Sequence, residues 1–367
     1  RASALATVLF AVTGLLPAHA AEKNGISPQS ISLPSGPGAI EGLGESFEPQ
    51  LNSGTSSYRV GITVPPGRRG MQPALGLAYN SGSGNGILGI GWTLTGIDAI
   101  QRQTEKGIPQ YYVTDTDLAP SGEELVPLSD GTFREENEAG FRRYHYDPVA
   151  NTWRCELPNG TDLALGETAN SRVESAGRTF RWHVTSAQDS NGNRIEFHYT
   201  SYPSSPGQAY LSRIEYTLHA TNPLPGKHVV YLAYDADVLV GASRPDAYSD
   251  FRSGFEVATA QRLRRIDICT SGGSFTPLST CANGEARVRA YEFAYEDEGA
   301  CSSGGNVCST GLVGASCTSD ADCVSGASRL SSVTIFGADD KSRVTDPTDE
   351  LRPPPARFEH PTLAPPG

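Results

Sequence analysis

Turn-forming residues interrupt this chain so often that long helices have little room to form. Its 367 residues include 40 glycines and 26 prolines. Inside a helix, each glycine costs roughly 1 kcal/mol and each proline about 3 kcal/mol relative to alanine. The runs between these residues are short and rich in tyrosine, threonine and valine, which suit the half-buried surface of a β-sheet. The sequence therefore predicts an all-β chain.

Short runs bounded by turn residues are predicted to be strands, paired as antiparallel hairpins in an extended sheet. In residues 180–184, apolar and polar residues alternate, so the apolar side chains share one face. Residues 246–259 are the stretch that we expect to form a short helix instead. The predicted strands are 58–64, 74–79, 92–100, 141–146, 179–185, 194–199, 211–218, 228–234, 262–268, 287–295 and 330–336.

The most specific turn signal is the pair Asn191-Gly192, which lies between two alternating runs. An Asn-Gly pair is typical of a type I′ turn, in which both central residues take positive φ. Two other runs end in Tyr-x-Tyr-Asp at 144–147 and in Tyr-x-x-Tyr-Asp at 231–235. The pattern indicates a loose series of hairpins rather than a solenoid of strict period.

The first twenty residues have the features of a secretory signal peptide. Apolar residues 4–16 lead into Pro17-Ala18-His19-Ala20, a small-x-small site that predicts cleavage after Ala20. The apolar run is shorter than the ~20 residues that cross a bilayer, which argues against a membrane anchor. We therefore expect a secreted or extracellular protein, or one at the cell surface, with no membrane span after signal removal.

The charge balance of the chain is acidic. The formal net charge of −12 becomes −13 once the signal segment, with Arg1 as its one charged side chain, is removed. An acidic surface repels phosphate backbones, so we expect no nucleic-acid partner.

Composition divides the chain after residue 20 into five segments. Residues 21–44 form a lead-in rich in glycine, proline and serine, and 45–300 form the main β domain. A Cys-rich insert at 301–324 precedes a closing strand of that domain at 325–345. Residues 346–367 are rich in proline, and we expect them to be a linker to a downstream region.

The seven cysteines are expected to form mainly disulfides, because export leads to an oxidising compartment. Cys269 and Cys281 flank a Gly/Ser/Pro loop and are a plausible local pair. Cys155 is then left as a small buried hydrophobic residue. Four further candidates lie in a segment without its own core, and their three possible pairings stay open: Cys301, Cys308, Cys317 and Cys323.

No metal or cofactor is expected. The cysteine spacings lack Cys-x-x-Cys, and no histidine lies between Cys301 and Cys323, so zinc is disfavoured. Asp320 and Asp322 could bind calcium, but two carboxylates in a loop are more often simply solvated.

Residues 84–89 match the Gly-x-Gly-x-x-Gly pattern of dinucleotide-binding proteins. That function requires a preceding strand and a following helix, whereas residues 90–94 are strand-like. We therefore favour a glycine turn that lets two backbones pass closely.

The other signatures of catalysis are missing, since the sequence has no Gly-x-Ser-x-Gly, His-Glu-x-x-His or Walker A pattern. The acidic runs Glu136-Asn137-Glu138 and Glu296-Asp297-Glu298 are interpreted as solvated loops. The histidines in or beside strands are interpreted as surface or core-edge residues, namely His145, His183, His198, His219 and His228. We therefore expect no enzyme.

The string from Ile31 to Trp92 goes beyond general β character. It resembles the opening of the SpvB-type domain, named for the Salmonella virulence plasmid B protein, which also begins the B components of insecticidal toxin complexes. Similarity continues through 102–109 and 122–127, and more weakly through 182–199 to about residue 265. The residues that carry the resemblance are Gly36, Pro37, Gly38, Gly42, Gly44, Tyr58, Pro66, Gly67, Tyr79, Gly82, Gly84, Gly86, Gly89, Gly91 and Trp92.

What the resemblance implies is architectural. In toxin-complex B components, the domain is followed by a propeller-like region and by Rhs-type Tyr-Asp repeats, which together build a hollow β-shell around a toxic cargo. The hairpin at 189–199 is similar to a degenerate Tyr-Asp repeat. The resemblance therefore implies an Rhs-shell-like sheet, with downstream propeller and Rhs-repeat regions, toxin-complex subunits and cargo as partners. The ADP-ribosyltransferase activity of the Salmonella protein lies in a separate C-terminal domain, which no part of this sequence resembles.

Two hypotheses for function follow. The first is a non-catalytic N-terminal structural segment of a secreted toxin-complex B or Rhs-like protein. The signal peptide and the Cys-rich insert depart from the toxin-complex pattern and favour an envelope or secreted Rhs-like protein. The alternative is a cell-surface adhesion or glycan-binding β module, with Trp92, Trp153 and Trp182 lining a sugar groove. Aromatic residues at alternating strand positions more often fill a core, which favours the first hypothesis.

Overall fold

The computed structural model describes residues 46–50, 54–112, 114–221, 228–238, 242, 244–271, 281, 285–296, 328–337 and 356–357. All of them belong to the compact unit Leu43–Gly367, which is distinct from the unit Arg1–Gly42. The predicted signal peptide, the lead-in and the Cys-rich insert therefore lie outside the described residues. Within the described part, no helix has the length and apolar character that a bilayer crossing requires.

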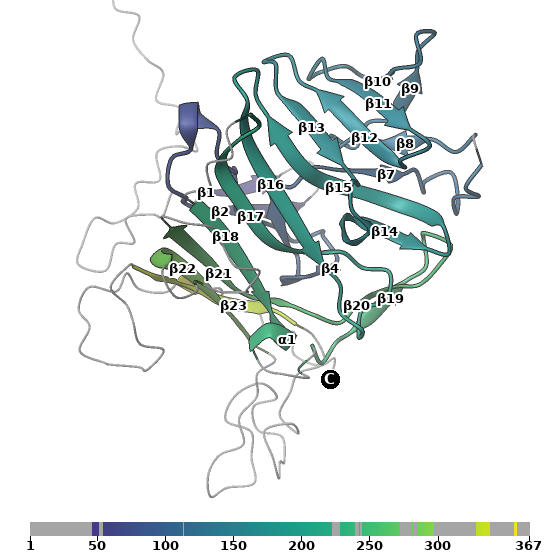
Figure 1. Cartoon of the computed structure of the whole chain (residues 1–367). Coiled ribbons are helices and arrows are strands. Elements are labelled where there is room, and N and C mark those ends of the chain that lie inside the picture. The colour runs from purple at the N-terminus through teal and green to yellow at the C-terminus, as the bar shows by residue number, and fades with distance from the viewer. Residues whose placement is uncertain are drawn as a thin grey trace, which may run out of the picture. The chain divides into compact units, whose positions relative to one another are not determined.

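The described strands are paired antiparallel, and most belong to one 16-stranded sheet (Figure 1). Neighbours in this sheet are largely neighbours in sequence, which confirms the predicted hairpins of an all-β chain. The main path of the sheet runs through β9 (Leu125–Pro127), β10 (Phe133–Glu135), β11 (Arg143–Asp147), β12 (Thr152–Glu156), β13 (Asp162–Leu165), β15 (Arg178–Gln188), β16 (Asn193–Thr200), β17 (Tyr210–His219), β18 (His228–Tyr234), β21 (Leu263–Ser271), β22 (Glu285–Tyr295), β23 (Leu330–Phe336) and β24 (Ala356–Arg357).

Strand β15 takes part in two hydrogen-bond ladders. Its first half pairs with β14 (Arg172–Ser175) on one side and with β7 (Ala99–Arg102) on the other. Its second half pairs with β13 and β16. Strand β8 (Asp117–Leu118) continues the branch beyond β7. The branch brings residues near 100 beside residues near 182. Residues of these two strands line a cavity that is described below.

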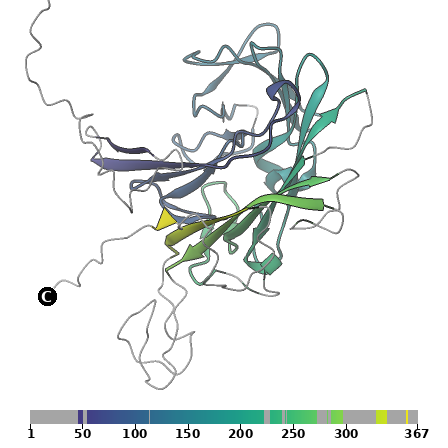
Figure 2. The ribbon, with the colours of Figure 1, turned by 90° about the vertical axis from the view of Figure 1, so that its left-hand side faces the viewer.

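A four-stranded sheet packs against the large one through a common core. It consists of β1 (Ser46–Gln50), β2 (Thr55–Gly61), β3 (Gly76–Asn80) and β6 (Trp92–Thr95). Its apolar residues Val60 and Leu77 belong to the same buried cluster as Ile266 and Val333. In Figure 2, the purple strands of this sheet face the green strands of the large one. The hydroxyl of Tyr291 also accepts a hydrogen bond from the backbone N–H of Thr63 at 2.9 Å.

Two of the predicted elements were wrong. The predicted strand 92–100 is split into β6 and β7, because Gly96 takes φ +91° and the chain changes sheets there. Residues 246–259 form no helix but the two-stranded sheet of β19 (Tyr248–Asp250) and β20 (Val257–Thr259). Ser253 hydrogen-bonds through its side chain to Phe255, and such local bonds compete with helix formation. The helical elements described are α1 (Asp235–Val238) and short 3₁₀ turns at Arg68–Gly70 and Ala169–Ser171.

The hairpin predicted at Asn191-Gly192 is present, but its turn is not type I′. Of the two residues only Gly192 has positive φ, at +80°. The carboxylate of Asp189 accepts the backbone N–H groups of Asn191 and Asn193, each at 2.9 Å. This Asx-type cap stabilises a longer turn that ends in a left-handed glycine, which is the geometry of a bulged hairpin.

Cys269 and Cys281 form the expected disulfide, with their Cα atoms 5.8 Å apart. Cys269 lies in β21 opposite Val229, and the two pack together with Tyr231 in a small buried cluster. Cys155 is free and buried, as predicted. Burial raises the pKa of its thiol to about 12, so this cysteine is not a nucleophile at neutral pH.

Replacing both Cys269 and Cys281 with alanine is expected to lower the free energy of unfolding by about 3 kcal/mol. The disulfide closes a loop in the unfolded chain and so lowers the conformational entropy of the unfolded state. Urea denaturation of the two forms measures the difference. Dithiothreitol should lower the stability of the natural chain by a similar amount and leave the double variant unchanged. Equal effects on both forms would show that the reductant acts elsewhere.

Candidate functional site

The glycine-rich turn at 84–91 is a meeting point of distant parts of the chain. It contains β4 (Asn85–Gly86) and β5 (Gly89–Ile90), which pair with each other and lead directly into β6. No helix follows, so the dinucleotide-binding alternative does not apply. Gly89 has φ +84°, and a methyl group there would overlap the carbonyl oxygen of Ser328. The close backbone passage that the glycines predicted is therefore confirmed.

The side chain of Arg244 is fully buried and binds this turn through several hydrogen bonds. Its Nη1 donates to the carbonyl oxygen of Gly86 at 2.7 Å, and its Nη2 donates to Oδ1 of Asn85 at 2.6 Å. Its Nε donates to Asp246 at 2.7 Å. Tyr248 adds a hydrogen bond from its hydroxyl to the carbonyl oxygen of Asn85 at 2.5 Å. The turn is thus fixed by charge-assisted bonds from a segment about 160 residues later in the sequence.

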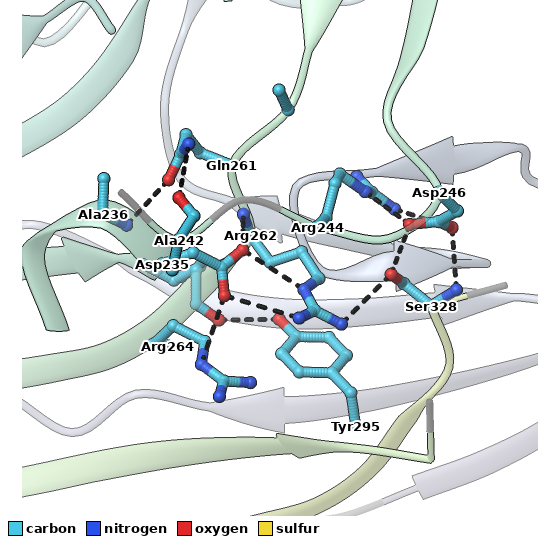
Figure 3. Close-up of polar contacts among 12 residues, drawn as sticks. Asp235, Ala236, Ala242, Arg244, Asp246, Gln261, Arg262, Arg264, Tyr295 and Ser328 are labelled. Atoms are coloured by element: carbon cyan, nitrogen blue, oxygen red, sulfur yellow. Dashed lines mark hydrogen bonds and ion pairs between the residues drawn. The ribbon is translucent and has the colours of Figure 1, made fainter. Parts of the chain in front are cut away.

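Ser328 links this arrangement to a second buried ion pair (Figure 3). Its hydroxyl and its backbone N–H both donate to Asp246, at 2.5 and 2.7 Å. The same hydroxyl accepts a hydrogen bond from Nη1 of Arg262 at 3.3 Å. Its carbonyl oxygen accepts the backbone N–H of Ile90 at 2.9 Å. Every polar group of Ser328 is therefore used.

The second ion pair joins Asp235 to Arg262. Asp235 is 4% exposed and accepts the backbone N–H of Arg262 at 2.8 Å and its Nε at 3.2 Å. Nε of Arg264 lies 3.3 Å from the other carboxylate oxygen of Asp235. The guanidinium of Arg262 lies over the ring of Tyr295, 4.6 Å from its centroid. We call the residues of the two pairs, with Ser328 and Asn85, the buried polar joint.

The buried polar joint stabilises the fold and has no reactive group to spare. Its carboxylates and guanidinium groups bond to other members or to backbone, and the members come from five separate places in the sequence. Sequence reasoning found the glycines of the turn but missed Arg244, Asp246, Asp235 and Arg262. These residues follow no motif, and their partners are far away along the chain.

Stability is expected to fall with acidification through Asp246. Burial alone would raise the pKa of this carboxyl, but hydrogen bonds from Arg244, Ser328 and Asn85 outweigh burial and hold it well below its usual range. A depressed pKa in the folded state stabilises the fold above the unfolded pKa, near 4, and this contribution is lost as the pH falls further. Urea denaturation from pH 6 to pH 2 should show the loss. The Asp246→Asn variant should show a shallower pH dependence, and an unchanged one would contradict the assignment.

The remaining residues singled out from the sequence do not converge. Glu136 and Glu138 are exposed, and Glu138 lies 3.8 Å from Arg134, which confirms a solvated loop. Asp297, Glu298, Asp320 and Asp322 lie outside the described residues, as do the four further cysteines. The five histidines lie on five different strands or strand ends, β11 and β15 to β18, as core-edge or surface residues.

The three tryptophans fill the core, as favoured from the sequence. Trp92 and Trp153 are 2% exposed and Trp182 is 1% exposed, so they form no open sugar groove. Trp92 packs against two family-motif tyrosines, with ring centroids 6.2 Å from Tyr58 and 5.3 Å from Tyr79. The three rings come from neighbouring strands β2, β3 and β6. The motif residues within the described part thus serve packing and turns.

One carboxyl has a pKa close to neutrality. Burial raises the pKa of Asp117 to about 6, against the opposing charge of Arg102, whose Nη1 lies 3.8 Å away. Asp117 lines neither of the two cavities described below. Neither of these cavities therefore brings a ligand to this carboxyl.

Residues 50–146 match the family model described as Salmonella virulence plasmid 65kDa B protein. This stretch is therefore similar to the SpvB-type domain, as the sequence string predicted. Mono(ADP-ribosyl)transferase SpvB of Salmonella typhimurium is 30% identical over 208 residues, which cover 48% of this chain and 34% of that protein. The SpvB relative of Salmonella dublin matches equally well. The chain therefore spans about a third of the length of the curated relatives it matches.

Three solved structures have the same fold as this chain. The crystal structure of TcdB2-TccC3 superimposes with a TM-score of 0.66 and 23% identity, covering 91% of this chain and 17% of that one. The N-terminal domain of effector protein SpvB from Salmonella typhimurium gives a TM-score of 0.59 and 20% identity, covering 76% of this chain and 98% of that one. The Tc holotoxin pore of Photorhabdus luminescens gives a TM-score of 0.62 and 23% identity, covering 84% of this chain and 16% of that one. At these identities, the matches show a common fold.

Proposed function

We propose that this chain is a non-catalytic structural segment of a secreted toxin-complex B or Rhs-like protein, where it helps to build a β-shell that encloses a toxin cargo. The observation that carries the proposal is the large antiparallel sheet together with its match to TcdB2-TccC3 over 91% of this chain. Downstream propeller and Rhs-repeat regions of the same polypeptide, toxin-complex subunits and cargo are the proposed partners. The segment boundaries, signal cleavage after Ala20 and the disulfides of the Cys-rich insert belong to the same proposal.

A structural role agrees with the chemistry of the described residues. The ion pairs Arg244–Asp246 and Arg262–Asp235 are buried and linked through Ser328, and the candidate acids Glu136 and Glu138 are solvated. The transferase activity in the name of the SpvB relatives belongs to proteins about three times as long as the matched region. The buried tryptophans give no support to the adhesion or glycan-binding alternative.

Cryo-electron microscopy of the full-length gene product tests the shell. We expect the sheet to continue beyond one of its edge strands, β9 or β24, into further strands that close around an internal volume. Limited proteolysis should leave an enclosed segment intact until the sheet is unfolded. A domain with both sheet edges in solvent and no enclosed volume would refute the proposal.

Two assays test the other parts of the proposal separately. The purified chain, incubated with labelled NAD⁺ and an acceptor protein lysate, should transfer no label, with a known ADP-ribosyltransferase as the positive control. N-terminal sequencing of the exported protein should begin at Ala21. Label transfer would contradict the non-catalytic role, and a retained N-terminal segment would contradict the predicted cleavage.

A further inference from the structure

A cavity of ≈ 520 Å³ lies where β15 meets β6, β7 and residues 208–211. Much of its wall is apolar or aromatic, with Trp92, Leu94, Ile97, Leu211 and Tyr234 among the lining residues. A second cavity of ≈ 500 Å³ adjoins it, and the two share four wall residues: Arg181, Gln208, Tyr248 and Thr259. These volumes fall in the range of small-molecule sites.

Arg181, on the shared wall, is a cation without a carboxylate partner among the described residues. Its Nε and Nη2 both donate to the neutral Oε1 of Gln101, at 3.0 and 2.6 Å. Its Nη1 makes no hydrogen bond to a described residue. Burial, together with the like charge of Arg252, lowers the pKa of Arg181 against the opposing charge of Asp250. A desolvated cation of this kind is costly unless an anion pairs with it.

Two carboxylates on the cavity walls, Asp98 and Asp250, are already engaged. Asp250 accepts Nε and Nη2 of Arg252, at 2.8 and 2.6 Å. Asp98 lines the first cavity, but its carboxylate lies 3.5 Å from Nη1 of Arg142. One positive charge is therefore left facing the cavities.

His183 adds a second unused polar group on the same face of β15, two residues after Arg181. Its Nε2 is buried and has no hydrogen-bond partner. Burial and the charge of Arg181 lower its pKa to about 3, so the ring is neutral, and it stacks on Tyr199 with centroids 5.3 Å apart. The neighbouring wall residue Gln208 has a partner, since its Nε2 donates to Thr259 at 3.1 Å. The unused groups thus converge at Arg181 and His183.

We propose that these adjoining cavities bind a small carboxylic acid with an aromatic or aliphatic body, its carboxylate paired with Arg181 and hydrogen-bonded to Nε2 of His183. A single unpaired cation matches the single charge of a carboxylate, and guanidinium is suited to its planar geometry. The aromatic and aliphatic wall residues would bury the body of the ligand. This site is independent of the proposed shell function.

Isothermal titration calorimetry with phenylacetate as the probe tests the site, with the uncharged phenylacetamide as the matched ligand. We expect saturable binding of phenylacetate that Arg181→Gln weakens by at least about tenfold, as for loss of a charged hydrogen bond. The control variant Arg154→Gln removes an exposed arginine that pairs with Asp162 and lines neither cavity, so it should leave the affinity unchanged. Phenylacetamide should bind at least tenfold more weakly than phenylacetate.

Unfolding of the ligand-free protein gives an independent readout. Because Arg181 lacks a counter-ion, Arg181→Gln should leave stability unchanged or raise it, as expected of a residue kept for binding. In NMR spectra, phenylacetate should shift the Cε1 signal of His183, and phenylacetamide should not. The proposal is overturned if Arg181→Gln binds phenylacetate as tightly as the natural chain, or if benzoate, phenylacetate and indole-3-acetate all fail to bind. Clear destabilisation by Arg181→Gln would equally show that the guanidinium serves the fold.

Discussion

Replacing Asp235 with asparagine is expected to lower the free energy of unfolding by about 3–5 kcal/mol. The carboxylate is 4% exposed and faces two guanidinium groups, Arg262 and Arg264. Asparagine keeps an acceptor oxygen but loses the charge, so a buried Arg262 remains without its counter-ion. Urea denaturation monitored by tryptophan fluorescence measures the change.

The matched control is Asp162→Asn. Asp162 also pairs with an arginine, at 2.9 Å from Nη2 of Arg154, but both side chains are roughly half exposed. Exposed pairs contribute about 1 kcal/mol or less. If the Asp235 and Asp162 variants lost the same stability, burial would not be the reason for the strength of the Asp235 pair.

The Arg244→Met variant is expected to lose a comparable amount, about 3–5 kcal/mol. Methionine fills much of the same volume, but it removes the guanidinium that donates to Asp246, to the carbonyl oxygen of Gly86 and to Oδ1 of Asn85. Hydrogen exchange should locate the damage, with faster exchange of the Ile90 and Leu263 amides, whose bonds hold the turn in place.

A double-mutant cycle separates the Arg244 pair from general loss of packing. Combined with Asp246→Asn, the Arg244→Met variant should show a coupling energy above about 1 kcal/mol, because the two residues act as one unit. Arg154→Met, at an exposed arginine, should change stability by less than about 1 kcal/mol. Additive effects in the cycle would contradict a direct contribution from the ion pair.

The long strands could be predicted from the sequence because alternation and turn residues mark them locally. Strand β16 is an example, because buried and half-buried residues alternate along it and a polar turn with Gly192 precedes it. Two-residue strands such as β4 and β8 are too short to carry a period, and they exist only through their neighbours. The same holds for the change of sheet at Gly96, where local sequence continued to favour a single strand.

The buried polar joint could not be predicted from the sequence, for a different reason. Arg244 bonds to Gly86, 158 residues earlier, and Asp246 bonds to Ser328, 82 residues later. Charged residues at such positions are ordinarily solvated, so no local pattern distinguishes them from surface residues. The resemblance of the string from Ile31 to Trp92 predicted the similarity to the SpvB-type domain correctly. It could not predict which distant residues, such as Ser328, pass close to the glycines of that string.

The dependence of the glycine turn on Ser328 also sets a limit on when this domain can mature during synthesis. The turn at Gly86 is made early, but the serine that completes its contacts follows 242 residues later. At typical elongation speeds this interval is roughly 12–50 s. Throughout that time the amino-terminal strands lack the hydrogen bond that Ser328 supplies to Ile90. Completion of the fold is thereby tied to the arrival of its last third.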